Sequence, residues 1–454
     1  MKKDIFEVNM SHFNPSHFAP KLPQDVLFIL QTLYNAGYEA YIVGGCVRDM
    51  ILCELHHTHK MPNDYDIATS ALPKQVSALF AHSIPTGAKY GTISVIIKSH
   101  QYEITTFRID GAYLNARSPQ SVRFTPSLSE DLKRRDFTIN ALAYAPHTGL
   151  IDEVGGVADI VHRRIMCVGE AHLRFTEDAL RILRALRFSA TLGFSIESTT
   201  KEAILDNAPL LLKVAKERVR VELSKLLGGE YAWRVLSDFL PLLHIIIPQL
   251  PMQCDFSLLQ YMPKDKEELV WSCFLHPCAP YAKDILESLK FSNKCKERIL
   301  TLLRFYDMPF TMDIVELRHI IVELGGRVNA QSVLEDVIVI KQALLQSQRE
   351  RGGLEDMTRE GINRGQKEQV KEMARELERF NLLLHNVLCS AMPLSLGELC
   401  INGADLKGIG IKEGKRMGEI LQTLLVQVLE EKIEHTPLAL LAYAQTLKKS
   451  WKFT

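Results

Sequence analysis

The sequence lacks any long hydrophobic run and any excess of charge of one sign. Its 54 Lys and Arg residues balance its 54 Asp and Glu residues, so no overall field attracts a polyanion and any nucleic-acid surface must be local. The most apolar stretch, residues 239–252, contains three prolines and is too short to span a bilayer. The composition therefore predicts a protein without a membrane role.

Paired cysteines and a secretion signal are also missing. The nine cysteines include no C-x-x-C pair, and the opening MKKDIFEVNM carries two lysines with no apolar segment after them. We therefore expect reduced thiols and a cytoplasmic location. The 454 residues exceed what one compact core normally holds, which predicts about two to four domains.

The distribution of apolar residues predicts two kinds of structure along the chain. A helical pattern over residues 22–37 leads to an apolar run at 41–43, and the β-rich runs 92–98 and 102–108 are separated by a polar turn, as in a hairpin. After about residue 170, helical periodicity dominates. We expect an α+β fold whose second part is helical, with a boundary or mobile connection in the charged segment 348–369.

A glycine pair follows the first predicted strand. Gly44 and Gly45 would let backbone N–H groups approach phosphate oxygens at the start of a helix, and Arg48 could bind a phosphate through its guanidinium. An ordinary strand-to-helix turn with a surface Arg48–Asp49 pair explains the same residues equally well.

Two acids separated by one residue, Asp64 and Asp66, come next. In an extended segment they project to the same face, where they could hold Mg²⁺ together with phosphate and water oxygens. Alone, such a pair is more often a solvated loop. Glu103, which shares a strand face with Thr105, could complete the site; a surface-facing residue of an edge strand is the alternative.

Two basic segments follow. Residues 133–135 (KRR) precede what reads as an apolar helix start and could hold phosphates, although such a run is usually a solvated surface. Farther on, residues 177–188 predict a helix with one apolar arc and a second arc that carries its arginines, with Asp178 beside Arg181.

The Asp178–Arg181 pair suggests base recognition. Cytosine and adenine both present an amino donor beside a ring-nitrogen acceptor, whereas uracil and guanine present the reverse. A carboxylate can accept from the amino group and a guanidinium can donate to the ring nitrogen. The pair could therefore select C and A without a template; a helix-stabilising ion pair is the alternative.

Taken together, several segments resemble class II tRNA nucleotidyltransferases of the polymerase-β superfamily: GGCVRD, DYDIAT, YEITTFRIDGAYLNAR, DLKRRDFTINALAY and RFTEDALRILRALRF. A tail segment, INGADLKGIGIKEGKRMGEIL, is similar to that family's tail domain. The resemblance implies a polymerase-β-like head, a mixed sheet with helices, followed by an all-α neck, body and tail. The implied boundaries are an N-terminal extension at 1–20, the head at 21–170, the neck at 171–250, the body at 251–385 and the tail at 386–454.

The resemblance also implies an activity: template-independent addition of CMP and AMP (CCA) to the 3′ end of tRNA from CTP and ATP, with release of pyrophosphate. Asp64 and Asp66 would hold the catalytic Mg²⁺, and Glu103 would be a third catalytic acid. The nucleotide-binding residues it implies are Gly44, Gly45, Arg48, Arg135, Asn140, Asp178, Arg181, Arg184 and Arg187.

The resemblance leaves alternatives open. The segment Asp110–Thr125 aligns with a loop that CC-only enzymes lack, which disfavours that activity, whereas A-addition alone and poly(A) synthesis remain. The link 53–64 is longer than usual in the family, and we interpret its His56, His57 and His59 as a solvated loop rather than a metal site. A non-catalytic RNA-binding protein and a nucleotidyltransferase acting on other substrates are rivals from other classes. The sequence does not predict the oligomeric state.

Overall fold

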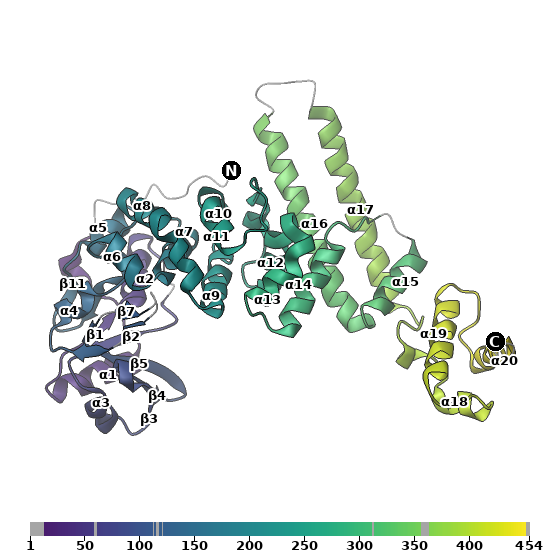
Figure 1. Ribbon diagram of the computed structural model, residues 1–454, viewed down its shortest axis with the longest axis horizontal. Helices are drawn as coiled ribbons and strands as arrows, with labels where there is room; N and C mark the ends of the chain where they lie inside the picture. Colours follow the sequence, from purple (N-terminus) through teal and green to yellow (C-terminus); the bar gives the residue numbers. More distant parts are fainter. Residues whose placement is uncertain are drawn as a thin grey trace. The chain divides into compact units, whose positions relative to one another are not determined.

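The computed structural model describes residues 13–58, 61–111, 113–114, 118–119, 121–310, 313–355 and 363–450 (Figure 1). The chain forms two compact units. Unit 1 contains Met1–Gln260 and Pro280–Ser292, and unit 2 contains Tyr261–Ala279 and Asn293–Thr454.

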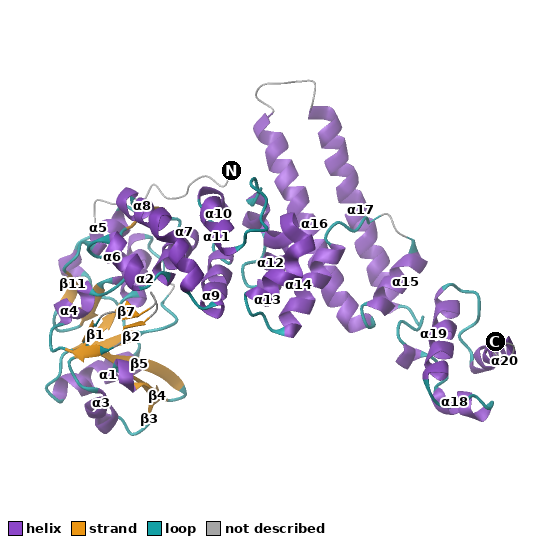
Figure 2. Ribbon diagram, in the orientation of Figure 1, coloured by secondary structure: helices purple, strands orange, loops and turns teal. Residues whose placement is uncertain are grey.

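A seven-stranded sheet forms the centre of the first part of unit 1 (Figure 2). Its order is β11-β10-β1-β2-β5-β4-β3, and the β2–β5 pair is parallel whereas the other pairs are antiparallel. The strands are β1 (Ala40–Val43), β2 (Asp66–Thr69), β3 (Ser83–Gly87), β4 (Thr92–Ile97), β5 (His100–Thr106), β10 (Leu142–Ala145) and β11 (Gly149–Asp152). The sheet is mixed, as expected, and β4 and β5 form the predicted hairpin.

Both faces of the sheet are buried at its inner strand β1, all four residues of which are buried. Tyr41 and Val43 of β1 lie in one apolar cluster with Leu128 and Leu132 of α4 (Leu128–Lys133). Ile42 points to the opposite face and is fully buried. The helices α1 (Gln24–Asn35) and α2 (Gly45–Leu55) pack on β1, and α3 (Pro73–Leu79) packs on β3 and β4.

The expected helix start after residues 133–135 is wrong. Helix α4 ends at Lys133, and the chain continues through a 3₁₀ turn, η4 (Thr138–Asn140), into strand β10. All four β10 residues are buried between β1 and β11. A short apolar run that is buried on both faces carries no periodicity, so the sequence does not distinguish it from a helix.

From about residue 170 onward unit 1 is helical, as predicted, apart from β13 (Ser195–Ile196), which forms a two-residue parallel ladder with β12 (Arg164–Ile165). Helix α7 packs against α6, α9 and α10. The helices of unit 1 after α4 are α5 (Gly156–Val161), α6 (Ala171–Glu177), α7 (Leu180–Leu192), α8 (Ser198–Asn207), α9 (Lys216–Leu227), α10 (Ala232–Asp238), α11 (Leu240–Ile246) and α13 (Ala282–Ser288).

Unit 2 is helical in its described residues (Figure 2). Its two longest helices, α16 and α17, lie side by side, and residues 356–362 of the charged connection expected at 348–369 lie outside the described part. The helices are α12 (Glu267–Leu275), α14 (Asn293–Phe305), α15 (Ile314–Glu323), α16 (Arg327–Glu355), α17 (Asn363–Cys389), α18 (Gly403–Gly408), α19 (Lys415–Leu429) and α20 (Pro437–Ser450).

Arg327, the first residue of α16, closes the end of α17. Its Nη1 donates to the carbonyl oxygens of Val387 (3.4 Å) and Leu388, and its Nη2 donates to those of Ser390 (3.0 Å) and Met392 (2.6 Å). Val387 and Leu388 belong to the last turn of α17, where carbonyls lack the usual intrahelical donor, and Val387 also accepts from the Ser390 N–H. The guanidinium thus supplies donors to this turn and to two carbonyls just beyond the helix.

We expect Arg327→Ala to destabilise unit 2 by about 1.5–3 kcal/mol, the usual contribution of hydrogen bonds to a charged group. Native-state hydrogen exchange of the α17 amides measures this free energy. Arg379→Ala is the matched control, because Arg379 lies on α17 with a side chain 75% exposed. Equal effects of the two substitutions would contradict the capping role.

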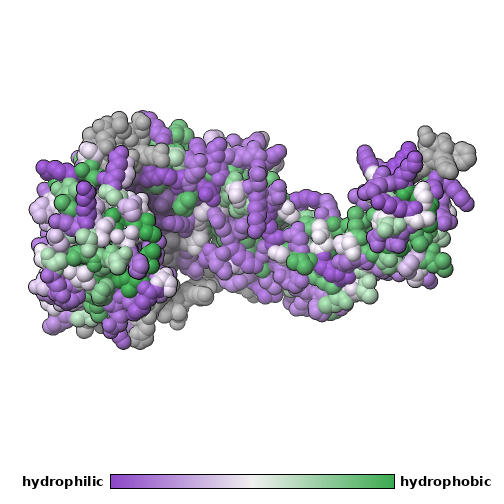
Figure 3. Space-filling model, turned by 90° about the horizontal axis from the view of Figure 1, so that it is seen from below, coloured by the Kyte–Doolittle hydropathy of each residue, from purple (hydrophilic) through white to green (hydrophobic). Residues whose placement is uncertain are grey.

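The surface agrees with the balanced composition. Hydrophilic side chains dominate much of the face seen in Figure 3, and apolar side chains gather in separate patches. Within the part of the chain that the structure describes, no helix has both the length and the apolar character needed to cross a membrane.

Candidate active site

The glycine turn joins β1 to α2, and three other predicted residues lie beside it: Arg48, Arg135 and Asn140. Gly44 has φ 81° and ψ −133°, a conformation that favours glycine, and a Cβ there would lie 3.0 Å from Nη1 of Arg135. Arg48 donates from Nη1 to Oδ1 of Asn140 at 2.6 Å and from Nε to Asp49 at 2.9 Å. The Arg48–Asp49 pair of the alternative interpretation is present, but Arg48 is buried, so the pair is not a surface pair.

Two of the predicted acids, Asp66 and Glu103, lie on one face of the sheet, and Asp64 lies two residues before Asp66, outside β2. Asp66 and Asp64 retain solvent access, whereas Tyr65 between them is buried. Asp66 is the register partner of Glu103 on β5, so these two side chains also share a face. Because β5 lies between β2 and β4, the alternative that places Glu103 on an edge strand is wrong.

The acid pair is electrostatically unfavourable in the protein alone. Partial burial raises the pKa of Asp66, Arg135 opposes this shift, and the neighbouring Asp64 carboxylate adds to it. Among the described residues, no three His, Cys, Asp or Glu side chains form a protein-only metal site. Mg²⁺ commonly takes one or two carboxylates and completes its shell with phosphate and water oxygens. Asp64 and Asp66 therefore fit a divalent cation that arrives with a phosphate ligand.

A pocket of about 690 Å³ opens over this face, within the usual size range of small-molecule sites. The sheet contributes Val43, Asp66, Thr92, Glu103 and Thr105 to its lining. The remaining charged lining residues are Arg108, Asp110, Arg134, Arg135, Asp136, Asp178, Arg181, Arg184, Arg218 and Glu222. Asp66, Glu103 and the predicted base-reading residues thus face one cavity.

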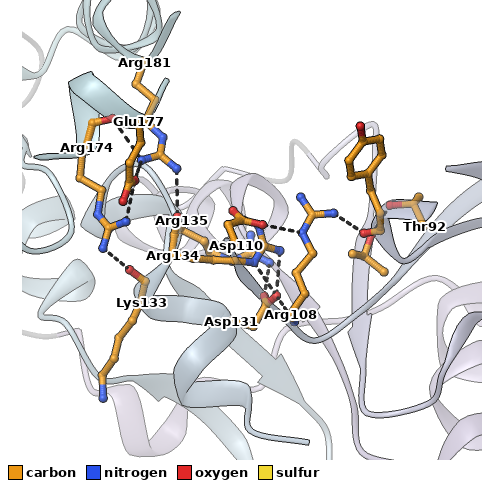
Figure 4. Close-up of polar contacts among 12 residues, drawn as sticks. Thr92, Arg108, Asp110, Asp131, Lys133, Arg134, Arg135, Arg174, Glu177 and Arg181 are labelled. Carbon is orange, nitrogen blue, oxygen red and sulfur yellow. Dashed lines mark hydrogen bonds and ion pairs between the residues drawn. The ribbon is translucent and has the colours of Figure 1, made fainter. Parts of the chain in front are cut away.

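A buried carboxylate that the sequence analysis did not single out organises the basic side of the pocket. Asp131 accepts from Arg134 at 2.7 and 2.9 Å and from Nη2 of Arg135 at 3.2 Å (Figure 4). Burial alone would raise the pKa of Asp131, but Arg134 and Arg135 outweigh burial and lower it. Asp131 therefore stays ionised and fixes both guanidinium groups.

The alternative interpretation, a helix-stabilising Asp178–Arg181 ion pair, is wrong, and both residues line the pocket. Arg181 donates to Glu177 at 2.7 Å and to the Arg134 carbonyl at 3.1 Å (Figure 4). Asp178 accepts from Arg218 at 3.2 Å. Because Asp178 is extended (φ −138°, ψ 101°) and precedes α7, helical i,i+3 geometry does not apply to it.

The arginine arc of α7 is also less exposed than expected. Arg181 is buried, Arg184 lies 2.6 Å from Oδ2 of Asp136, and Arg187 lies 3.3 Å from Oε2 of Glu222. Acids on neighbouring elements thus neutralise the arginine face of α7, which the helical periodicity predicts to be polar. Glu222 and Arg218 both belong to α9. The only sequence signal for their role in the pocket is the alternation of charged and apolar residues in ERVRVE, residues 217–222.

Asp136 gives a testable pH dependence. Burial would raise its pKa, but the Arg184 guanidinium outweighs burial and lowers the pKa to about 2. The ionised carboxylate therefore contributes stability above the unfolded pKa of about 3.9, and this contribution is lost as the pH falls toward 2.

We expect Asp136→Asn to lower the free energy of unfolding at pH 7 by about 2 kcal/mol, from the pKa difference. The difference in unfolding free energy between variant and parent should narrow below about pH 4 in urea titrations, where the carboxylate of the unfolded parent starts to protonate. A gap that stays constant between pH 3 and pH 7 would contradict the Asp136–Arg184 coupling.

Two sequence predictions fall partly outside the described residues. In the segment 110–125, β6 (Arg108–Asp110) pairs with β9 (Val122–Phe124), and β7 (Tyr113–Leu114) pairs with β8 (Ser118–Pro119), while residues 112, 115–117 and 120 lie outside. His56 and His57 directly follow α2, and His59 lies outside. Residues 53–55 of the link belong to the end of α2, and the interpretation of His56, His57 and His59 as a solvated loop stays a prediction.

Three family models match parts of this chain. A family model described as "Poly A polymerase head domain" matches residues 40–166, a second, "Probable RNA and SrmB- binding site of polymerase A", matches residues 193–252, and a model of a second tRNA nucleotidyltransferase domain matches residues 357–444.

Individual relatives extend the match to nearly the whole chain. A CCA-adding enzyme of Leuconostoc citreum (strain KM20) is 37% identical over 437 residues, which cover 94% of this chain and 97% of the relative. One of Geobacillus stearothermophilus is 50% identical over 213 residues, 47% of this chain and 51% of the relative. The crystal structure of the Bacillus stearothermophilus CCA-adding enzyme with CTP aligns with a TM-score of 0.72 at 31% identity, covering 94% of this chain and 98% of that one. The chain therefore belongs to the CCA-adding enzymes, a family of tRNA nucleotidyltransferases.

Proposed function

We propose that this protein adds CMP and AMP to the 3′ end of tRNA, using CTP and ATP and releasing pyrophosphate, without a template. The observation that carries the proposal is one pocket lined by Asp66 and Glu103 together with Asp178 and Arg181. Nearly full-length relatives are CCA-adding enzymes, and one is known in complex with CTP. A cytoplasmic location is part of the proposal.

The family uses a divalent metal ion, and we assign Mg²⁺ to Asp64 and Asp66, with Glu103 as the adjacent third acid. When bound, Mg²⁺ would lower the pKa of the tRNA 3′-hydroxyl and stabilise the developing charge on the leaving oxygen. The raised pKa of Asp66 supports this assignment, because a cation between the two carboxylates would relieve their repulsion.

The surrounding residues would hold the nucleotide. We assign the triphosphate to Gly44, Gly45, Arg48, Arg135 and Asn140, which converge at the β1–α2 turn. Asp178 would accept the amino hydrogen shared by cytosine and adenine, and Arg181 would donate to the ring nitrogen. Arg184 and Arg187 would support the pocket through Asp136 and Glu222.

We further propose that the helical regions divide the remaining work. Residues 171–250 form the neck that recognises the base, residues 251–385 form the body, and residues 386–454 form a tail that binds tRNA. The tRNA would be bound mainly through its phosphates. The glycine-containing segment Gly403–Gly418, which starts α18 and extends into α19, is a candidate contact.

Incubation with a tRNA that ends at the discriminator base tests the proposal. Each NTP alone and CTP with ATP together are supplied, and products are resolved at single-nucleotide length. We expect two additions with CTP alone and three with CTP and ATP. Addition of A only would indicate an A-adding enzyme, and long A tails would indicate a poly(A) polymerase. Binding of tRNA without extension would support a non-catalytic role.

A further inference from the structure

Three guanidinium groups surround one aromatic ring beside the proposed nucleotide site. The Cζ atoms of Arg187, Arg48 and Arg184 lie 4.3, 5.2 and 5.5 Å from the centroid of the Phe188 ring. Arg48 belongs to α2, whereas Arg184 and Arg187 precede Phe188 on α7. All three distances lie within about 6 Å, the range in which an aromatic ring attracts a cation.

The three arginines have like charges that repel in a partly buried space. Burial lowers the pKa of Arg187, Glu222 opposes this shift, and the Arg184 and Arg48 charges add to it. Each guanidinium also has one acid partner: Asp49 for Arg48, Asp136 for Arg184 and Glu222 for Arg187. The face of an aromatic ring is electrostatically negative, so the single Phe188 ring attracts all three guanidinium groups.

The ring itself is held firmly. Phe188 is only 8% exposed, and it packs edge-on against the fully buried Phe137, with centroids 5.8 Å apart and an interplanar angle of 83°. Phe137 immediately follows Asp136, the carboxylate that binds Arg184. Packing thus fixes the position of the Phe188 ring, and the guanidinium groups contact this fixed ring.

These guanidinium groups adjoin the place where phosphates would enter. A Cβ on Gly45 would lie 3.5 Å from Nη2 of Arg48, so that group lies directly against the glycine turn. Arg184 lines the pocket. A ring that fixes Arg48 and Arg184 therefore fixes charges on two sides of the same site.

We propose that Phe188 is a positioning residue for the incoming nucleotide, whose ring holds Arg48, Arg184 and Arg187 in the arrangement that receives the triphosphate. This inference rests on the proposed function. The alternative, that Phe188 only fills the core, depends on its shape alone, whereas attraction of cations depends on the charge distribution of the ring.

Stepwise fluorination separates the two roles. Replacing Phe188 with mono-, di- and trifluorinated phenylalanine removes electron density from the ring face while nearly preserving its shape. We expect the KM for CTP and for ATP to rise at each step, reaching about tenfold with three fluorines, or about 1.4 kcal/mol. The kcat should change less than about twofold, because the lost interaction acts on binding.

Phe175 is the matched control. It is fully buried in α6, and within the described residues no cation lies over its ring. The same fluorinated series at Phe175 should leave both KM values unchanged. A second measurement, the affinity for inorganic tripolyphosphate, should fall in step with fluorination at Phe188 only.

The outcomes are distinct from those that test the proposed function. If the unsubstituted enzyme extends tRNA but the Phe188 series shows flat KM values and flat tripolyphosphate affinity, this inference is overturned and the proposed function stands. If the unsubstituted enzyme adds no nucleotide, the proposed function fails, and the tripolyphosphate series still decides the role of Phe188.

Discussion

Asp66→Asn should abolish nucleotide addition and leave the folded protein at least as stable as the parent. Loss of a metal-holding carboxylate removes several kcal/mol of charge stabilisation at the reacting phosphate, which lowers kcat by roughly 10³-fold or more. The stability result has the opposite sign, because a raised pKa means that the ionised Asp66 is less favourable in the folded protein than in the unfolded chain. The neutral amide does not carry that penalty.

Two measurements check this prediction. Single-turnover extension of tRNA gives the rate, and thermal unfolding without divalent metal gives the stability. Added Mg²⁺ should raise the unfolding temperature of the parent more than that of the variant, because only the parent keeps both carboxylates.

Asp206→Asn is the control for an ordinary carboxylate, since Asp206 is 68% exposed on α8. It should keep parental activity and the parental response to Mg²⁺. Near-normal turnover by purified Asp66→Asn would refute the metal assignment, and unfolding of that variant at much lower temperature would refute the electrostatic account.

The local features of the site were predictable because their signals are local. Gly44 had to lie at a turn, and alternation placed Asp64 and Asp66 on one side of the chain with Tyr65 on the other. The 92–108 hairpin followed from two β-rich runs and a polar turn.

Contacts between distant elements were not predictable from the same signals. The partner of Asp178 is 40 residues away on α9, and Arg184 binds Asp136, 48 residues earlier. The helical periodicity of α7 contains no information about neighbouring elements, so it predicted an exposed arc of arginines. In the structure, acids from other elements pair with these arginines. Asp131 was overlooked because a single acid near a basic run has no characteristic spacing.

Asp178→Ala and Arg181→Ala should both erode the choice of nucleotide more than the rate of addition. A bidentate contact to a base discriminates by about 1–3 kcal/mol, so the preference for CTP over UTP and for ATP over GTP should fall by about 5- to 150-fold. Each side chain already has protein partners, Arg218 and Glu177 respectively. An incoming base therefore meets groups that are held in place, which reduces the entropy lost on binding.

The ratio of kcat/KM between correct and incorrect nucleotides measures this choice. Asp178 also accepts from the backbone N–H of Leu180 at the start of α7, so Asp178→Asn is a second variant that can keep this cap while changing the group presented to the base. Arg379→Ala, an exposed arginine of α17, is the control and should keep full preference. If the variants at both Asp178 and Arg181 kept full preference against UTP and GTP, the base would have to be recognised by other residues of the pocket.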